Sequence, residues 1–466
     1  MSNVSIAMRL DRLPITILHK KATVLIGTGL FFDFFDIFLA GVLSTVLEEH
    51  FHVAHELLPL LLGSSFLGMF IGAIVLNGLA DRFGRKKAFM FNLAVYSVFT
   101  LLAAFSPNVG LLIVFRFLAG LGLGAEPPLC DTYLSELLPA SKRGKYVAWA
   151  YTLGFLAMPV EGFLAKLLVP LQFLGFEGWR WLFIIGSIGS LVVWILRRNL
   201  PESPRWLAAA GRLEEANRIT AQFEEEAKKK RTDLVPLFSS STQTLPEQMP
   251  KQKVSFAVLF QKQYLQSTVM LWFFQILQTI GYYGFGTLVP LILKAKGYSV
   301  IHSLEYTAFT FLGYPIGSLL SLPLVERIDR KWLIVLSAFL MGVFGISFGV
   351  TENPMLIILF GVLYTLVSNV FSNAFHIYQA EIFPTSVRAT ATGVAYSLSR
   401  FMSGLMPFLL LPILKQYGST VMFTVVAIAM GLIMIDIGLL GPRTTGRSLE
   451  EINEEKFHPS DSHISM

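Results

Sequence analysis

Long apolar runs, separated by short polar or charged clusters, make up most of the chain. A helix needs roughly 20 apolar residues to cross the hydrocarbon core of a bilayer. Twelve runs reach this length and predict twelve transmembrane helices. They lie at approximately 22–47, 57–80, 86–105, 109–136, 144–170, 179–198, 265–293, 303–325, 332–350, 354–382, 388–414 and 419–441.

One longer polar segment, 200–262, divides these spans into two groups of six. It contains Glu-Glu-Glu-Ala-Lys-Lys-Lys-Arg and then a stretch rich in Ser, Thr, Gln and Pro, which predicts a surface helix followed by a flexible linker. The predicted organisation is an N-terminal six-helix bundle in 1–199, a cytoplasmic loop in 200–262, a C-terminal six-helix bundle in 263–441 and a cytoplasmic tail in 442–466.

The second half of the chain repeats motifs of the first half at a constant offset of 245 residues. Gly78–Lys87 reads GLADRFGRKK, and Leu324–Lys331 reads LVERIDRK. The offset carries Asp81, Arg82, Arg85, Tyr133, Glu136, Pro139 and Arg143 onto Glu326, Arg327, Arg330, Tyr378, Glu381, Pro384 and Arg388. Several matches at one offset indicate a tandem duplication. We therefore predict an all-α membrane protein whose twelve transmembrane helices form two pseudo-symmetric six-helix bundles.

The composition also indicates a membrane protein. Hydrophobic residues make up 54% of the chain and charged residues only 15%, with a mean hydropathy of +0.61, whereas soluble domains carry about 25% charged residues. The net charge of +6 does not indicate a nucleic-acid partner, because the basic residues fall in short loops between apolar runs. The single cysteine, Cys130, excludes a disulfide framework or a zinc cluster within one chain.

The distribution of Lys and Arg predicts the orientation in the membrane. Of the 37 basic residues, 30 lie at the termini and in the loops on one side, two lie within spans and five lie on the opposite side. These five are Lys166, Arg180, Lys294, Lys296 and Lys415. Cytoplasmic loops are enriched in Lys and Arg, so we expect both termini and the long loop in the cytoplasm. The first twenty residues lack the apolar core of a cleaved signal peptide, so we expect the first apolar run to be a span.

Several motifs resemble the major facilitator superfamily of transporters over almost the whole chain. Gly78–Lys87 is similar to that superfamily's loop between spans 2 and 3, and Leu324–Lys331 is its weaker copy. The sugar-porter and organic-ion branches are resembled by Pro201-Glu-Ser-Pro-Arg205, Arg116-x-x-x-Gly-x-Gly-x-Gly124 and Gly446-Arg-Ser-Leu-Glu450, although Pro442-Arg-Thr-Thr departs from their usual Pro-Glu-Thr-Lys. The bacterial metabolite:proton symporters, which include nicotinate and aromatic-acid transporters, are resembled by Phe32-Asp-x-x-Asp36, Gly120-Leu-Gly-Leu-Gly-Ala-Glu126, Tyr282-Tyr283-Gly and Ser399-Arg400-Phe.

Charged residues at the predicted cytoplasmic ends of the spans are candidates for a gate. Acids and bases alternate at matching places in both halves. Such a network can hold the halves together when the cavity faces outward, and it must break when the cavity faces inward. The alternative is that these residues only anchor the loops in the cytoplasm. The candidates are Asp81, Arg82, Arg85, Glu136, Arg143, Glu326, Arg327, Arg330, Glu381 and Arg388.

Charged residues within the spans are candidates for proton coupling, because a charge at mid-bilayer costs at least about 2.5 kcal/mol and requires a partner or a function. In proton-coupled sugar porters an aspartate of span 1 pairs with the arginine that begins R-x-x-x-G-x-G-x-G, and the resemblance places Asp36 and Arg116 at these positions. A carboxylate beside an arginine can hold or lose its proton as its surroundings change. Asp33, Glu126 and Glu161 are further candidates, the last two beside prolines. The alternative for Asp36 and Arg116 is a permanent salt bridge between spans 1 and 4.

The predicted substrate site departs from the sugar-porter pattern. Where that pattern has amides, a proline and a tryptophan, the chain has Tyr151, Trp272, Phe273, Gln278, Asn373 and His376. Arg400 has no acid near it in its own span, so it is a candidate clamp for a substrate carboxylate. The alternative is a bridge from Arg400 to Glu126 or to an aspartate across the cavity. Aromatic walls around a cation favour a flat or small organic anion. The candidate binding residues are Arg400, His376, Tyr282, Asn373, Tyr151 and Gln278, with Tyr283 and Tyr314 as weaker candidates.

We therefore expect a secondary transporter rather than an enzyme, which imports a small organic anion such as nicotinate together with protons by alternating access. The glycine-rich run Gly120–Gly124 has no strand before it and does not predict a nucleotide site. No Walker sequence is present, so ATP is not the expected energy source. The resemblance to proton-coupled transporters implies the proton gradient as the energy source, and we expect no cofactor and no metal. The expected setting is a monomer in a bacterial inner membrane, with no nucleic-acid partner. The alternatives are a sugar or polyol transporter or facilitator, an exporter, and a transporter-like sensor that signals through 200–262.

Overall fold

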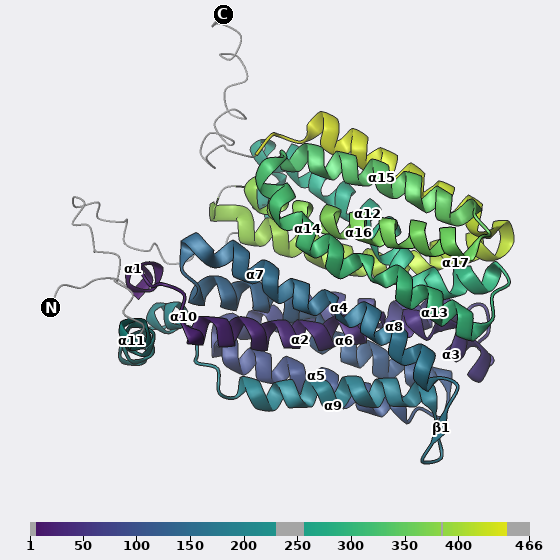
Figure 1. The fold of residues 1–466 in the computed structure, drawn as a ribbon. Helices are drawn as coiled ribbons and strands as arrows, with labels where there is room; N and C mark the ends of the chain where they lie inside the picture. The colour runs from purple at the N-terminus through teal and green to yellow at the C-terminus, as the bar shows by residue number, and fades with distance from the viewer. Residues whose placement is uncertain (1–5, 230–255, 384, 445–466) are drawn as a thin grey trace, which may run out of the picture.

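The computed structural model describes residues 6–229, 256–383 and 385–444, apart from the side chains of residues 77–79, 81, 385, 386 and 389 (Figure 1). Three of the predictions above fall outside this part of the chain. They concern the linker within 230–255, the tail beyond residue 444 and the side chain of Asp81.

Eleven helices of the described chain are long and apolar enough to cross a membrane. They are α2 (Ile17–Val42), α4 (Leu58–Phe83), α5 (Arg85–Ala104), α6 (Val109–Leu137), the broken helix α7–α8 (Ala140–Phe155 and Ala157–Leu168), α9 (Gly178–Arg197), α12 (Lys262–Ala295), the broken helix α13–α14 (Val300–Phe311 and Gly313–Arg327), α15 (Arg330–Val350), α16 (Pro354–Glu381) and α17 (Thr385–Ile435). The last of these, α17, changes direction at Gly418, where φ is 81°. Its two arms correspond to the eleventh and twelfth predicted spans, so the prediction of twelve spans is confirmed.

Shorter elements connect or flank these helices. They are α1 (Ile6–Asp11), α3 (Ser44–His50), α10 (Pro204–Ala209), α11 (Leu213–Lys229), the 3-10 helix η1 (Phe256–Phe260), the π-helix η2 (Asp436–Leu440) and the antiparallel hairpin of β1 (Gln172–Phe173) and β2 (Phe176–Glu177), in which Gln172 pairs with Glu177. The helix α11 and the hairpin lie at opposite ends of the molecule (Figure 1). We therefore call these ends the α11 end and the hairpin end.

The same local signal begins one helix in each half. At the start of α6 the Asn108 side chain accepts a hydrogen bond from the Leu111 N–H at 2.9 Å, and at the start of α16 the Asn353 side chain accepts one from the Met355 N–H at 2.9 Å. Asparagine is favoured at this position because its oxygen satisfies a backbone donor that has no partner within the helix. The two caps are 245 residues apart, so the repeat extends to the helix starts.

The packing inside each half follows the same repeat. Gly72 on α4 lies against the backbone of Leu121 on α6, and Gly317 on α14 lies against the backbone of Leu366 on α16. At both glycines an added Cβ would overlap a backbone oxygen. Small residues let transmembrane helices approach closely where no hydrophobic driving force acts between them. Both contacts are related by the 245-residue offset, so the prediction of two pseudo-symmetric bundles is confirmed.

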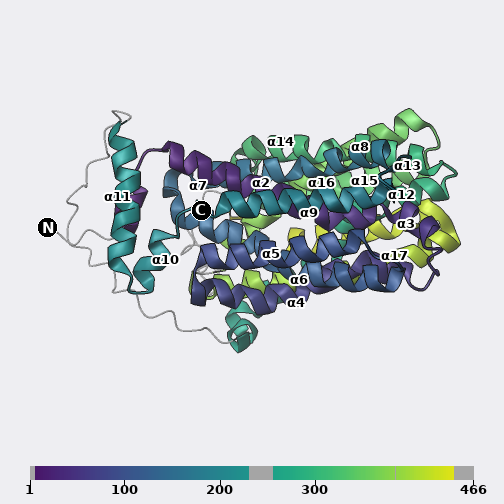
Figure 2. The ribbon, with the colours of Figure 1, turned by 90° about the horizontal axis from the view of Figure 1, so that it is seen from below.

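The two halves lie side by side with their helices roughly parallel (Figures 1 and 2). One half contains α2 to α9, and the other contains α12 to α17 with η2. They meet where α2 packs on α12, α4 on α17, α7 on α14 and α8 on α13. The two broken helices, α7–α8 and α13–α14, therefore pack against each other along one edge of the boundary between the halves.

Ion pairs join the two halves at the hairpin end. Lys166 pairs with Glu305 at 2.6 Å, and Glu48 pairs with both Lys294 at 3.3 Å and Lys415 at 3.2 Å. At the α11 end, every ion pair between described side chains lies within one half, if α1, α10 and α11 are counted with the first half. Three of the five basic residues predicted for the outer side thus hold the halves together, which the sequence analysis did not anticipate.

Closure of the hairpin end also depends on a glycine. A Cβ added to Gly162 on α8 would lie 2.7 Å from the Ala308 Cα on α13. We expect Gly162→Leu to separate the halves at the hairpin end, because a larger side chain cannot fit between these backbones. The measurement is the distance between spin labels on Leu174→Cys and Met355→Cys, introduced into a Cys130→Ser background. Both label sites are exposed, and the distance should lengthen.

The matched control is Gly431→Leu, because a Cβ at Gly431 meets nothing within 4 Å. This variant should leave the label distance unchanged. An unchanged distance in folded Gly162→Leu protein would show that the α8–α13 contact does not set closure.

Candidate functional site

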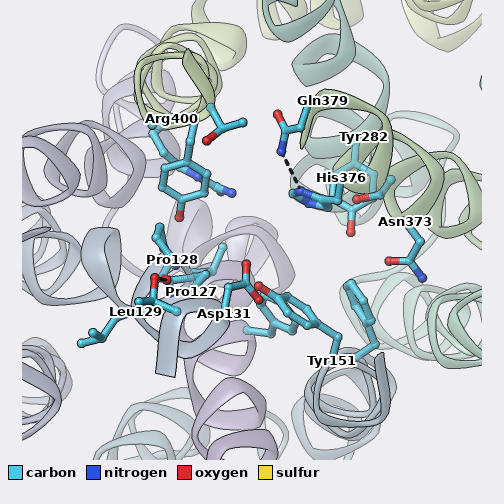
Figure 3. A pocket seen from close by; sticks show the side chains of 18 of the residues that line it. Pro127, Pro128, Leu129, Asp131, Tyr151, Tyr282, Asn373, His376, Gln379 and Arg400 are labelled. Carbon is cyan, nitrogen blue, oxygen red and sulfur yellow. Dashed lines mark hydrogen bonds between the residues drawn. The ribbon is translucent and has the colours of Figure 1, made fainter. Parts of the chain in front are cut away.

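A cavity of about 420 Å³ lies between the two halves (Figure 3). Its walls come mainly from α2, α6 and α7 of the first half and from α12, α16 and α17 of the second half. Ala80 and Arg85, where α4 ends and α5 begins, line it toward the α11 end. This volume is within the range of small-molecule sites, about 300–1,000 Å³. Ion pairs join the halves at the hairpin end, and the residues that line the cavity reach toward the α11 end.

Arg400 is a buried cation in the wall of this cavity. Its side chain is 7% exposed, and its Nε and Nη1 atoms have no hydrogen-bond partner among the described residues. The guanidinium lies over the rings of Tyr396 and Tyr283, at 4.5 and 4.8 Å from their centroids. The faces of the two rings attract the positive charge of the guanidinium. They do not form hydrogen bonds with the N–H groups that point outward in the guanidinium plane. No ion pair to Glu126 or to an aspartate is described for Arg400, and the guanidinium can therefore donate to an anion.

The other predicted binding residues have different placements. Tyr151, Tyr282, Asn373 and His376 line the cavity together with Arg400 (Figure 3). The Asn373 amide donates to the Ser321 hydroxyl at 2.7 Å, and the His376 Nδ1 lies 3.2 Å from the Gln379 amide nitrogen.

Gln278 is not part of the cavity wall. Its amide donates to Gln275 at 3.1 Å and to the Ser399 hydroxyl at 3.3 Å. It therefore helps to pack α12 against α17. Tyr314 is also buried away from the cavity, at 0% exposure.

Asp131 lines the cavity, although the sequence analysis did not select it. It is exposed to the cavity, and the Tyr151 hydroxyl lies next to its carboxylate (Figure 3). Pro127 and Pro128 line the same wall. Residues four apart share one face of a helix, so the position of Asp131 relative to Pro127 was the available signal. Glu126 directly precedes Pro127 and is therefore turned about 100° away from it around the helix.

Asp36 and Arg116 form the predicted pair. The Arg116 Nη1 donates to the Asp36 carboxylate at 2.9 Å and its Nη2 donates to the Asp36 backbone oxygen at 2.7 Å, while the Thr100 hydroxyl donates to the other carboxylate oxygen at 2.8 Å. Asp36 is 1% exposed and Arg116 is 0% exposed, and neither lines the cavity. The pair lies inside the first bundle and joins α2 to α6.

Glu126 forms a second buried ion pair, with Arg197 at the end of α9. Arg197 is 1% exposed and lies 4.6 Å from the ring centroid of Phe89. The sequence analysis counted Arg197, at the end of a span, among the 30 basic residues of the cytoplasmic side. Glu126 therefore does not line the cavity, although it precedes two prolines that do, Pro127 and Pro128.

Two further acids of the first half are buried and form no ion pair with the described side chains. These are Asp33 on α2 and Glu161 on α8, each 0% exposed. Asp33 interacts electrostatically with Glu126, Arg197 and Asp36. Buried acids of this kind within transmembrane helices mark proton or ion pathways.

Comparison with known proteins identifies the family. Residues 21–455 match the family described as sugar (and other) transporter. The chain belongs to this family. Two relatives are a putative metabolite transport protein of Bacillus subtilis, YyaJ, 33% identical over 95% of this chain and 96% of its own length, and the niacin transporter NiaP of Acinetobacter baylyi, 30% identical over 96% of this chain and 100% of its own length.

A solved structure shares the fold. The xylose transporter XylE of E. coli, in a partially occluded inward-open conformation, matches with a TM-score of 0.76 at 18% identity, over 93% of this chain and 100% of that chain. XylE is a major facilitator superfamily protein. The chain is therefore a multi-pass membrane transporter of the sugar (and other) transporter family, with a small-molecule substrate, and not an enzyme, and it has the fold of XylE.

The charged residues at the α11 end of the transporter pair within each half. Arg85 pairs with Glu136 at 2.8 Å, and Arg330 pairs with Glu381 at 3.2 Å. These two pairs are equivalent under the 245-residue offset. Arg388 donates to the Phe383 backbone oxygen at 3.3 Å. Both ion pairs thus lie within a single half.

The remaining gate candidates have other surroundings. Arg143 lies 4.0 Å from Asp11, and Arg82 lies over the ring of Phe83. Glu326 and Arg327 are exposed at the end of α14. The Asp81 side chain is outside the described part of the chain.

Glu202 is a charged residue at the α11 end that the sequence analysis named only as part of a motif. Its carboxylate accepts hydrogen bonds from the backbone N–H of Arg85 at 2.9 Å and of Lys86 at 3.2 Å, at the start of α5. Burial raises the pKa of Glu202 above its usual range, because desolvation outweighs these donors. The carboxylate thus fixes the loop after α9 to the first turn of α5.

The structural role of the Glu126–Arg197 pair can be tested by removing one or both partners. Losing one partner of a buried ion pair costs about 3–5 kcal/mol, whereas replacing both by apolar residues is often neutral. We expect Glu126→Leu to lower the unfolding temperature of the detergent-purified transporter strongly. The double variant Glu126→Leu/Arg197→Met should recover most of that loss.

The control is Arg198→Met at the neighbouring exposed position, which should change the unfolding temperature little. If the double variant is as unstable as Glu126→Leu alone, the instability of Glu126→Leu does not come from leaving Arg197 unpaired.

Proposed function

We propose that the transporter imports a small organic anion together with protons. The observation that carries this proposal is Arg400, a buried cation with unpartnered N–H groups beside the cavity. Planar guanidinium groups bind carboxylates with two parallel hydrogen bonds. The rings around it, Tyr282, Tyr283 and Tyr396, suit a flat substrate. A relative named as a niacin transporter supports the same substrate class, since niacin is an aromatic carboxylate.

The orientation proposed for the transporter has the α11 end in the cytoplasm. Of the 37 Lys and Arg residues, 30 belong to that side, as expected for cytoplasmic loops. The cavity then faces inward in this structure, and the hairpin end is the closed outer side. The setting is a bacterial inner membrane, in keeping with relatives such as the inner membrane metabolite transport protein YdjE of E. coli.

Alternating access would exchange the two sets of ion pairs. Lys166–Glu305 and the pairs of Glu48 hold the outer side closed in this state. They must separate for the cavity to open outward. The cytoplasmic charges, including Arg85 and Arg330, would then exchange partners and join the halves on the inner side.

The proton route proposed for this cycle runs through the first half. Glu161 interacts electrostatically with Asp36 and Arg116, and Asp33 interacts with Asp36 and Glu126. These four acids form a continuous series inside the bundle, beside the cavity but not in its wall. Asp36 is the acid that Arg116 can hold or release, which is the requirement for coupling a proton to substrate movement.

The anion site can be tested with Arg400→Gln. A hydrogen bond to a charged group contributes about 1.5–3 kcal/mol, and each 1.4 kcal/mol is tenfold in affinity. We expect nicotinate to bind at least about tenfold more weakly to this variant, while nicotinamide, its neutral analogue, changes little. Binding to the detergent-purified protein would be measured by calorimetry.

Arg400→Lys, which keeps the charge but loses the planar fork, should retain part of the nicotinate affinity. Equal losses for nicotinate and nicotinamide would assign Arg400 to structure. Binding of sugars with no response to carboxylates would favour the sugar or polyol transporter instead.

The proton route can be tested with Asp36→Asn. We expect this variant to lose accumulation of substrate against a gradient in proteoliposomes while it retains exchange, because the amide cannot take up and release the proton. Asp436→Asn, which alters a mostly buried acid of the second half outside this series, is the matched control. Unimpaired uphill uptake by Asp36→Asn would show that Asp36 and Arg116 form a permanent salt bridge.

A further inference from the structure

The cavity has an acid in the wall of one half and a guanidinium in the wall of the other, at positions that the repeat does not relate to each other. The 245-residue offset relates Asp131 to His376, Tyr151 to Tyr396 and Phe155 to Arg400, and all six residues line the cavity. The repeat therefore gives the two walls the same backbone positions with different chemistry. The first half presents an acid and the second half presents a guanidinium (Figure 3).

A cluster of aromatic rings adjoins the acid, with Tyr151 directly beside Asp131. Phe34, Tyr151 and Phe155 all line the cavity, and their ring centroids lie 4.9 Å apart for Phe34 and Phe155, 6.3 Å for Phe34 and Tyr151, and 6.4 Å for Tyr151 and Phe155. Groups of aromatic faces beside an acid recognise quaternary ammonium and similar cations. No cation of the described protein forms an ion pair with Asp131, so this wall is available to a cation from the substrate.

The opposite wall has the complementary property. Arg400 is more than nine-tenths buried, and its Nε and Nη1 atoms lack partners among the described residues. Among the described residues, Arg85 is the other arginine that lines the cavity, and it pairs with Glu136 at 2.8 Å. A simple anion bound at Arg400 would leave the Asp131 carboxylate without a counter-charge in the same cavity. A molecule with a cation at its other end would satisfy both walls.

We propose that Asp131, with Phe34, Tyr151 and Phe155, forms a cation subsite, and that the substrate is a zwitterion with a quaternary or ring nitrogen and a carboxylate. This inference rests on the anion site proposed for Arg400 and specifies its substrate class. The carboxylate binds Arg400 in the second half, and the cationic nitrogen lies among the rings beside Asp131 in the first half. One substrate then contacts both halves, which is what a transporter that moves its halves around a single site requires.

The experiment uses pairs of ligands with the same shape that differ only in the cationic nitrogen. One pair is N-methylpyridinium-3-carboxylate and 3-methylbenzoate, and the second is trimethylammonioacetate and 3,3-dimethylbutanoate. We expect the zwitterion of at least one pair to bind the detergent-purified full chain about tenfold more tightly than its anionic partner. Asp131→Asn should remove this preference and leave the affinity for the anionic partner equal or higher.

Two further variants separate the roles. Asp131→Glu should keep the preference because it keeps the charge, and Phe155→Leu should weaken the zwitterion more than the anion. Arg400→Gln should weaken both members of a pair. If Arg400→Gln binds the anion as tightly as the unchanged protein does, the anion site proposed at Arg400 is wrong. The preference for the zwitterion, and its loss in Asp131→Asn, still decide the cation subsite separately.

The absence of a preference in both pairs overturns the cation subsite, as does a preference that survives Asp131→Asn. A third result would also overturn it. If Asp131→Asn abolishes proton-driven uptake but leaves the ratio unchanged, Asp131 carries a proton rather than binding a cation. The unfolding temperature of each variant shows whether it is folded. If Asp131→Asn does not fold, the separate variants Asp131→Glu and Phe155→Leu still test the subsite.

Discussion

An ionised side chain inside a bilayer must have a partner, reach water or serve a function, because its transfer into hydrocarbon costs several kcal/mol. This constraint organises the charges of the transporter. Asp36 with Arg116 and Glu126 with Arg197 satisfy it as buried pairs inside the first bundle. Arg400 satisfies it in another way, through the rings of two tyrosines and access to a cavity.

The two halves share their packing but not these charges. The 245-residue offset carries Arg116 onto Gly361 and Glu126 onto Phe371, so the charged partners of the first bundle have no counterpart in the second. The contacts that do repeat are helix caps, glycine contacts and the ion pairs at the α11 end. Repeated positions therefore build the scaffold and the candidate gate, whereas the buried ion pairs of the first bundle and Arg400 lie at positions that differ between the halves.

Much of the fold was predictable because its signals are local or periodic. Apolar runs predict the spans and the constant offset predicts two related bundles, and both depend only on spacing along the chain. Arg85 with Glu136 belonged to a repeated motif and could be selected in the same way.

Side-chain direction was not predictable to the same degree. Glu126 and Asp131 lie on one helix, and which of them faces the cavity depends on the rotation of α6 against its neighbours. Arg197 illustrates the same difficulty, because a basic residue at the end of a span usually marks the cytoplasmic side. Here it turns inward to Glu126. Tertiary packing, which a single sequence does not encode position by position, decides these cases.

The arrangement of α2 gives the proposed coupling a physical route. Phe34, Ile37 and Phe38 line the cavity, and they follow the three- and four-residue spacing of one helix face. Asp33 and Asp36 lie on a different face of α2, which is turned into the first bundle toward Arg116 and Arg197. The substrate cavity and the acidic series are thus separate spaces that share one helix. A rotation or shift of α2 that accommodates a substrate would necessarily move both aspartates relative to their arginines. Coupling between substrate and proton then needs no direct contact, only that α2 move as a rigid body.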